Sequence, residues 1–340
     1  MTRISNYLIL LLLILTFYGF LRIYNSYGQQ LTILPDLNKD NWDRPMEFIE
    51  NIEVDFPNLS ATALPLKSIQ AQYYLYSDSI NKGMKLVDEV IAEKSNPFIM
   101  LPEALKAKYY NTLGVKDSAY YYSRKAFSGL PRNPFHFAEL IRSLNSELKR
   151  DSIDEYFKQI KYPFNDQVWR IYIAASISDQ KDNDFAKQTA IEAIQNTQNK
   201  SDPNNLLRIA AFMKLYGTDT FEQALEIEKL ANEYFKKDMF NDSKPLYEEL
   251  ITLMPMNYIY KENLAVSLFN LKDYTKTVQY FEEVEDEGHI LDKSQIFVLG
   301  ISLHNIGKVN QGCNRLFDAQ KQEFAEATRA INILCSQISK

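Results

Sequence analysis

The stretch from Leu230 to Pro255, LANEYFKKDMFNDSKPLYEELITLMP, carries a spacing of small and large residues that returns along most of the chain. The same pattern is repeated 34 residues later and again 35 residues after that. The matching positions are Ala231, Tyr234, Ser243, Tyr247 and Leu250; Ala265, Leu268, Thr277, Phe281 and Val284; and Gly300, Leu303, Gly312, Leu316 and Ala319. A period near 34 with small residues at two fixed places predicts paired antiparallel helices that cross closely at those residues.

This pattern resembles the tetratricopeptide repeat (TPR), and looser matches upstream bring the predicted number of repeats to seven. The upstream repeats begin their matches at Ala71, Ala107, Ile141 and Ala174. The resemblance implies an all-α, right-handed superhelical solenoid of antiparallel helix pairs over residues 65–320, with a C-terminal capping helix over 321–340. The fourth and fifth matches lie 57 residues apart, and the apolar spacing of Leu206–Tyr216 predicts a helical insertion near 203–217.

The N-terminal segment, residues 1–28, is predicted to be one hydrophobic helix directed to a membrane. Residues Tyr7–Leu21, YLILLLLILTFYGFL, form an uncharged run of fifteen residues between Arg3 and Arg22. This is shorter than the roughly 20 residues that span a bilayer, but Arg22 can extend its charge to the interface, where Tyr24 is also favourable. We expect an uncleaved signal-anchor; a cleaved signal peptide is the alternative, because Ser26 and Gly28 supply small residues near a cleavage site.

The charges around the apolar run predict its orientation. Arg3 and the amino terminus precede the run, and only Arg22 follows it closely. The positive-inside bias therefore favours a single-pass protein of the cytoplasmic (inner) membrane whose repeats lie on the extracytoplasmic, periplasmic side. Residues 29–64 are expected to form a polar linker and a pre-repeat segment.

Composition narrows the class of partner. The net charge is −6 and the isoelectric point is near 5.3, so the chain lacks the basic field that binding to nucleic acid requires. We therefore expect a protein or peptide partner, together with the membrane bound by the N-terminal segment, and no nucleic acid.

The two cysteines, Cys313 and Cys335, are too few for a disulfide framework or a thiolate zinc site. If the helix that holds Cys313 turns near Gln320 into an antiparallel helix, the residue opposite Cys313 lies near position 328. This leaves Cys335 about two turns away, so we expect two buried thiols.

No catalytic motif is present in the sequence. The three histidines, His136, His289 and His304, lie in different repeats, and no phosphate-binding glycine loop, nucleophile elbow or zinc-protease motif occurs. The sequence therefore predicts a non-catalytic scaffold without catalytic residues, cofactor or metal.

The candidate binding residues come from the resemblance to the TPR family, in which the first helix of each pair lines a concave groove. Positions one and four residues after the small residue would face a ligand there. In the last three repeats these groove residues are Asn232, Phe235, Val266, Phe269, Ile301 and His304.

A weaker resemblance concerns two segments, NLSATALPLKSIQAQYYLY at 58–76 and DSAYYYSRKAFSGLPRNPFH at 117–136. They look like repeat segments of O-antigen ligase family proteins. This resemblance implies an accessory role in the assembly or export of surface polysaccharide as the alternative function, because those ligases cross the membrane many times and this chain crosses it once at most.

Overall fold

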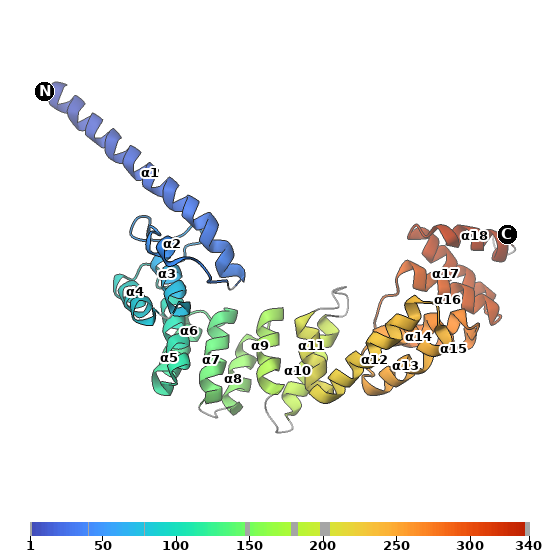
Figure 1. Ribbon diagram of the computed structural model, residues 1–340. Coiled ribbons are helices and arrows are strands. Elements are labelled where there is room, and N and C mark those ends of the chain that lie inside the picture. The colour runs from blue at the N-terminus through green and yellow to red at the C-terminus, as the bar shows by residue number, and fades with distance from the viewer. Residues whose placement is uncertain are drawn as a thin grey trace. The chain divides into compact units, whose positions relative to one another are not determined.

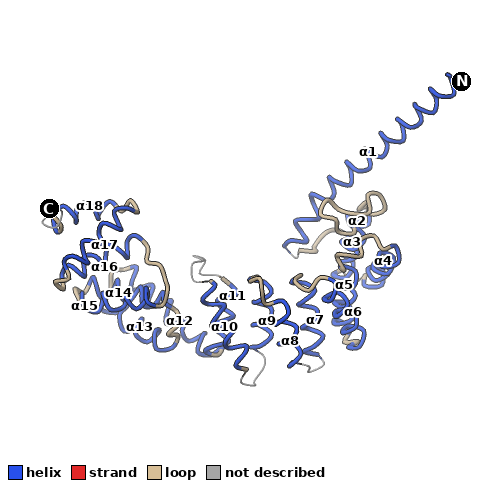
Figure 2. The backbone as a smooth tube through the Cα atoms, turned by 180° about the vertical axis from the view of Figure 1, so that it is seen from behind, coloured by secondary structure: helices blue, strands red, loops and turns tan. Residues whose placement is uncertain are grey.

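The computed structural model describes residues 2–39, 41–77, 79–146, 150–177, 183–197 and 205–336 (Figure 1). Within these ranges it contains eighteen helices and no strand (Figure 2), which confirms the all-α solenoid of helix pairs. The chain forms two compact units, residues 1–175 and 176–340, and each is described by itself below.

The first unit begins with helix α1, Thr2–Lys39, which is unbroken although it contains Pro35. The large apolar side chains of residues 7–18 are exposed, whereas Ile33 in the C-terminal half is buried with Trp42, Ile49 and Ile69. Among the described residues α1 is the one helix that is long and apolar enough to cross a membrane.

The prediction of a polar linker from residue 29 is wrong for residues 29–39, which belong to α1. Polar residues in this part of α1 make tertiary contacts instead of forming a flexible linker. The carboxylate of Asp36 accepts hydrogen bonds from the Arg44 guanidinium at 2.6 and 2.9 Å and from the Tyr73 hydroxyl at 2.8 Å. These bonds join the end of α1 to the first repeat.

After the short helix α2, Met46–Glu50, the first unit continues as consecutive helix pairs. The helices have about three to four turns, few residues separate one from the next, and neighbouring helices along the chain pack on each other. The helices are α3 (Leu66–Tyr76), α4 (Ile80–Glu93), α5 (Leu101–Leu113), α6 (Lys116–Gly129), α7 (Pro134–Ser146), α8 (Arg150–Ile160) and α9 (Asp166–Ile177).

The second unit follows the same plan with one additional helix. Helix α11, Leu206–Tyr216, lies between α10 and the 19-residue helix α12, and packs on both. The other helices are α10 (Asp184–Asn196), α12 (Thr218–Lys236), α13 (Phe240–Leu253), α14 (Tyr258–Asn270), α15 (Tyr274–Asp286), α16 (Lys293–Asn305), α17 (Val309–Lys321) and α18 (Ala325–Leu334).

The small residues of the repeat lie where the two helices of a pair cross. A Cβ built on Gly83 in α4 would lie 3.0 Å from the carbonyl oxygen of Ala71 in α3. Ala231, Ser243 and Ala265 are completely buried. The spacing read from the sequence therefore reports the crossing points, because a larger side chain there would separate the helices.

The fourth repeat departs from the predicted register. Ala174 is exposed, whereas Tyr172 and Ile173 are fully buried and Ser176 is nearly so. Tyr172 stacks on Phe157, with ring centroids 4.0 Å apart. Large residues occupy the buried face of α9, so the repeat pattern was assigned one residue too far along the chain when its fourth match was placed at Ala174.

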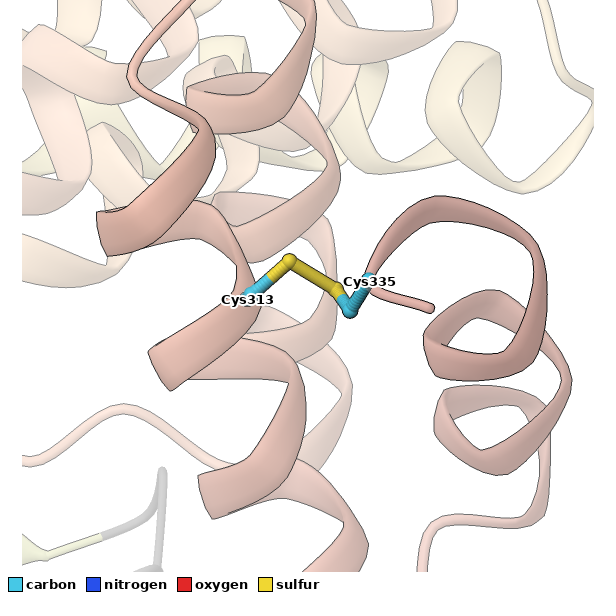
Figure 3. Close-up of a disulfide and its surroundings, with 2 residues drawn as sticks. All are labelled: Cys313 and Cys335. Atoms are coloured by element: carbon cyan, nitrogen blue, oxygen red, sulfur yellow. A yellow bond between two sulfur atoms is a disulfide. The ribbon is translucent and has the colours of Figure 1, made fainter. Parts of the chain in front are cut away.

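The expectation of two separate thiols is wrong, because Cys313 and Cys335 form a disulfide with a Cα–Cα distance of 5.8 Å (Figure 3). Helix α17 continues to Lys321 and α18 begins at Ala325, so the turn between them lies later than we assumed. The position opposite Cys313 moves from near 328 to near 333, close to Cys335. The bridge fastens the capping helix to the last repeat.

Candidate partner-binding groove

The first helices of the last three repeats carry side chains at matching positions, one and four residues beyond each crossing. All six predicted groove residues are half-buried. They are Asn232 and Phe235 on α12, Val266 and Phe269 on α14, and Ile301 and His304 on α16. We call this set the groove stripe; its role in binding stays a prediction.

The α12 part of the groove stripe is partly occupied by contacts with its own repeat. The ring of Phe235 meets those of Phe240 and Tyr247 edge-on, with centroids 5.7 and 6.0 Å apart. The amide oxygen of Asn232 accepts a 2.8 Å hydrogen bond from the Tyr247 hydroxyl. These contacts fix the orientation of both side chains while leaving part of each accessible.

The α14 and α16 parts are held in the same way. Phe269 meets Tyr274 edge-on at 5.9 Å, and Val266 packs on the core around Phe281. Ile301 packs on the cluster that contains the disulfide. These contacts restrict the rotamers of Phe269, Val266 and Ile301 before any ligand binds.

Sequence reasoning missed the acidic residues that lie one turn earlier on the same helices. Glu228 precedes Asn232 by four residues, and Glu262 precedes Val266 by four, which places each pair on one helix face. Glu228 accepts a 2.8 Å hydrogen bond from the Tyr260 hydroxyl. Burial raises the pKa of the Glu262 carboxyl to about 7. The i, i+4 spacing was the signal that could have revealed them.

The additional helix α11 contributes a buried cation to the same region. The guanidinium of Arg208 lies over the rings of Tyr258 and Phe212, at 4.9 and 5.4 Å from their centroids, and donates a 3.1 Å hydrogen bond to Asn257. The charge of Arg208 opposes the increase in the pKa of Glu262 that burial causes. The insertion thus supplies a buried cation at the start of α14.

The corresponding helices of the first unit are more polar. Asn111 on α5 donates a 2.9 Å hydrogen bond to the carboxylate of Glu139 on α7, and its amide oxygen accepts one of 3.1 Å from Ser143. Burial raises the pKa of Glu139. The amide of Asn111 is therefore committed to the contact between α5 and α7.

The described residues contain no group of three or more His, Cys, Asp and Glu side chains placed to hold a metal ion. No protein-family model and no curated protein matches the chain.

Solved structures that are similar to it include two helical-repeat proteins of low sequence identity. One is a tetratricopeptide repeat protein from Parabacteroides merdae, with 11% identity and a TM-score of 0.35, covering 79% of this chain and 98% of its own. The other is a monomeric mutant of IFIT1 with Gppp-AAAA, with 12% identity and a TM-score of 0.27, covering 90% of this chain and 80% of its own. The description of this chain as a TPR-like helical-repeat protein rests on its own repeat spacing and paired helices.

Proposed function

We propose that this chain is a membrane-tethered, non-catalytic scaffold that binds a protein or peptide along the groove stripe. The observation that supports this proposal is that three successive first helices present half-buried apolar or aromatic side chains at equivalent positions of the repeat. Packed helices lie about 10 Å apart, so a ligand lying along the groove stripe would meet one such position per repeat. Partly exposed, preorganised aromatic side chains are common anchors of protein interfaces.

The disulfide supports the extracytoplasmic location proposed from the N-terminal charges. Such bridges persist mainly in oxidising compartments. The ion pair between Arg22 and Glu53 supports an uncleaved anchor, because cleavage before Gln29 would remove it. We therefore propose a single-pass inner-membrane protein whose repeats lie in the periplasm.

Partner capture by the full-length protein from detergent-solubilised membranes tests the binding role. The double variant Phe235→Ala with Phe269→Ala should reduce capture at least about tenfold, because anchors of this kind contribute about 2 kcal/mol each. The control is Glu249→Ala with Gln279→Ala, two exposed positions on the second helices α13 and α15. Full capture by a folded groove variant would exclude the groove stripe as the site.

The location has its own test. Protease is added to cells whose outer membrane is permeable and whose inner membrane is closed. Digestion of the repeats is expected, and their survival would place them in the cytoplasm. Intact-mass measurement should show the uncleaved chain, and a mature chain starting near Gln29 would contradict the anchor.

A further inference from the structure

Beyond the apolar run, α1 has two faces of opposite character. Residues that pack on the repeat domain lie on one side, at Ser26, Gln30, Ile33 and Asp36, all buried. On the opposite side, large apolar residues remain exposed; these are Phe20, Tyr24, Tyr27 and Leu31. The outer face therefore continues the apolar character of the anchor into the part of α1 that carries the first repeat.

A loop of the first unit is fastened to the inner face at the same level. Arg22 forms an ion pair with Glu53. The side-chain oxygens of Gln29 and Gln30 accept 2.8 Å hydrogen bonds from the backbone N–H groups of Glu53 and Ala61. The loop between α2 and α3 is thereby held beside α1 (Figures 1 and 2).

The length of the apolar run places this loop close to a bilayer surface. The fifteen residues Tyr7–Leu21 rise only about 22 Å, whereas a hydrocarbon core is about 30 Å thick. If α1 spans the bilayer, the edge of the hydrocarbon core therefore lies at Leu21 or beyond it. The next about 10 Å of α1, from Arg22 to Gln29, then overlap the headgroup layer, which is about 5–7 Å deep on each side.

Exposed aromatic side chains lie at this level on both faces of α1. Tyr24 and Tyr27 are 75% and 49% exposed on the outer face, and Phe56 in the loop is 49% exposed. Aromatic residues are favoured at the boundary between lipid and water. Asp55, beside Phe56, is exposed and its carboxylate lies 3.4 Å from the amine of Lys67, so the loop has no excess of positive charge.

We propose that the loop Glu53–Ala61 is a lipid-contact surface, with Phe56 inserting into the headgroup region of the bilayer that α1 crosses. Tyr24 and Tyr27 contact the same layer from the other side of the helix. The contact is apolar rather than electrostatic, because the exposed charge of the loop is negative. The inference rests on the proposed membrane tether and extends it to a second point of attachment.

Tryptophan fluorescence of the full-length protein in phosphatidylcholine vesicles tests the contact. Three variants, Phe56→Trp, Tyr24→Trp and Tyr121→Trp, are compared in lipid with and without bromine atoms near the headgroup end of the acyl chains. Tyr121 is 61% exposed on α6 and serves as the control. The natural Trp42 and Trp169 are buried, and the unsubstituted chain measures their background.

Brominated lipid should quench the added emission of Phe56→Trp and Tyr24→Trp and leave that of Tyr121→Trp unchanged. Quenching at Tyr24→Trp without quenching at Phe56→Trp would overturn the loop contact and leave the anchor intact. Quenching at neither position would refute the membrane span itself. If Phe56→Trp does not fold, Asn58→Trp, at an exposed position of the same loop, replaces it with the same expectation.

Discussion

The carbonyl oxygen of Gly300 lies 2.7 Å from the position that a Cβ on Gly312 would occupy, so α16 and α17 meet backbone to backbone. The same Cβ would lie 2.8 Å from the backbone nitrogen of His304. Neither atom can move without moving a helix. The last repeat therefore depends on two glycines that face each other across the crossing.

Gly312→Ala should destabilise the second unit. Overpacking of this kind costs about 1–3 kcal/mol, against a gain of up to about 1 kcal/mol from the better helix propensity of alanine. Thermal unfolding followed by circular dichroism should show a lower melting temperature. Asn314→Ala, at an exposed position on the same helix, is the control and should change it little. A variant that is as stable as the control would contradict the close crossing.

The disulfide can be distinguished from two buried thiols by mass. The purified protein is unfolded without reductant and treated with an alkylating agent, and we expect no added mass, because Cys313 and Cys335 are joined. Two adducts would show separate thiols. Replacement of both cysteines by alanine should lower stability by about 2–4 kcal/mol, since a bridge of this kind restricts the unfolded chain.

Asp36→Asn should loosen the junction between α1 and the first repeat. The substitution removes one charge from a carboxylate that binds both Arg44 and Tyr73, and the interaction with Arg44 lowers the pKa of Asp36. Loss of a buried partner of this kind costs about 1–3 kcal/mol. Limited proteolysis should therefore cut faster within residues 41–45, whereas the exposed control Asp43→Asn should leave the rate unchanged. Equal rates would argue against a fixed junction.

His136 should make the protein sensitive to acid. Its ring is buried, with Nδ1 3.2 Å from the carbonyl oxygen of Ala126, and burial lowers its pKa to about 4 from an unfolded value near 6.5. The unfolded chain therefore binds the proton first as the pH falls. Stability is fully present above pH 6.5 and is lost toward pH 4, by about 2 kcal/mol between pH 7 and pH 5.

His136→Asn isolates this effect, because an asparagine amide can still donate to Ala126. The variant should be less stable than the parent at pH 7 but should lose less stability between pH 7 and pH 5. Denaturant unfolding at the two pH values measures the difference. Parallel losses in the two proteins would show that His136 does not carry the acid sensitivity.

The helix pairs were predictable because small residues at helix crossings leave a spacing that sequence alone reveals. The register could be read less well where large residues fill the buried face, as Tyr172 and Ile173 do on α9. The C-terminal part of α1 was predicted as a linker because Gln29, Gln30 and Asp36 are polar residues typical of linkers. Only their tertiary hydrogen bonds show that they belong to a packed helix.

The candidate site divides in the same way. The groove stripe follows from repeat spacing, whereas Arg208 depends on how α11 is placed against residues about fifty positions later in the chain. The prediction for the two cysteines was wrong because the turn between α17 and α18 lies a few residues later than expected, which moves the position opposite Cys313. The local sequence pattern predicts the repeats, whereas the contacts between distant segments can be seen only in the structure.

The continuity of α1 sets how far the first repeat can move from the membrane. If residues 29–64 were a flexible tether, the first repeat could move roughly 30–35 Å from the end of the anchor. In the proposed membrane protein, side-chain hydrogen bonds instead join the C-terminal end of α1 to the first repeat, and the helix acts as a short rigid spacer. Rotation of the anchor in the bilayer would then turn the first repeat with it, and the first repeat would be held at a fixed height above the lipid.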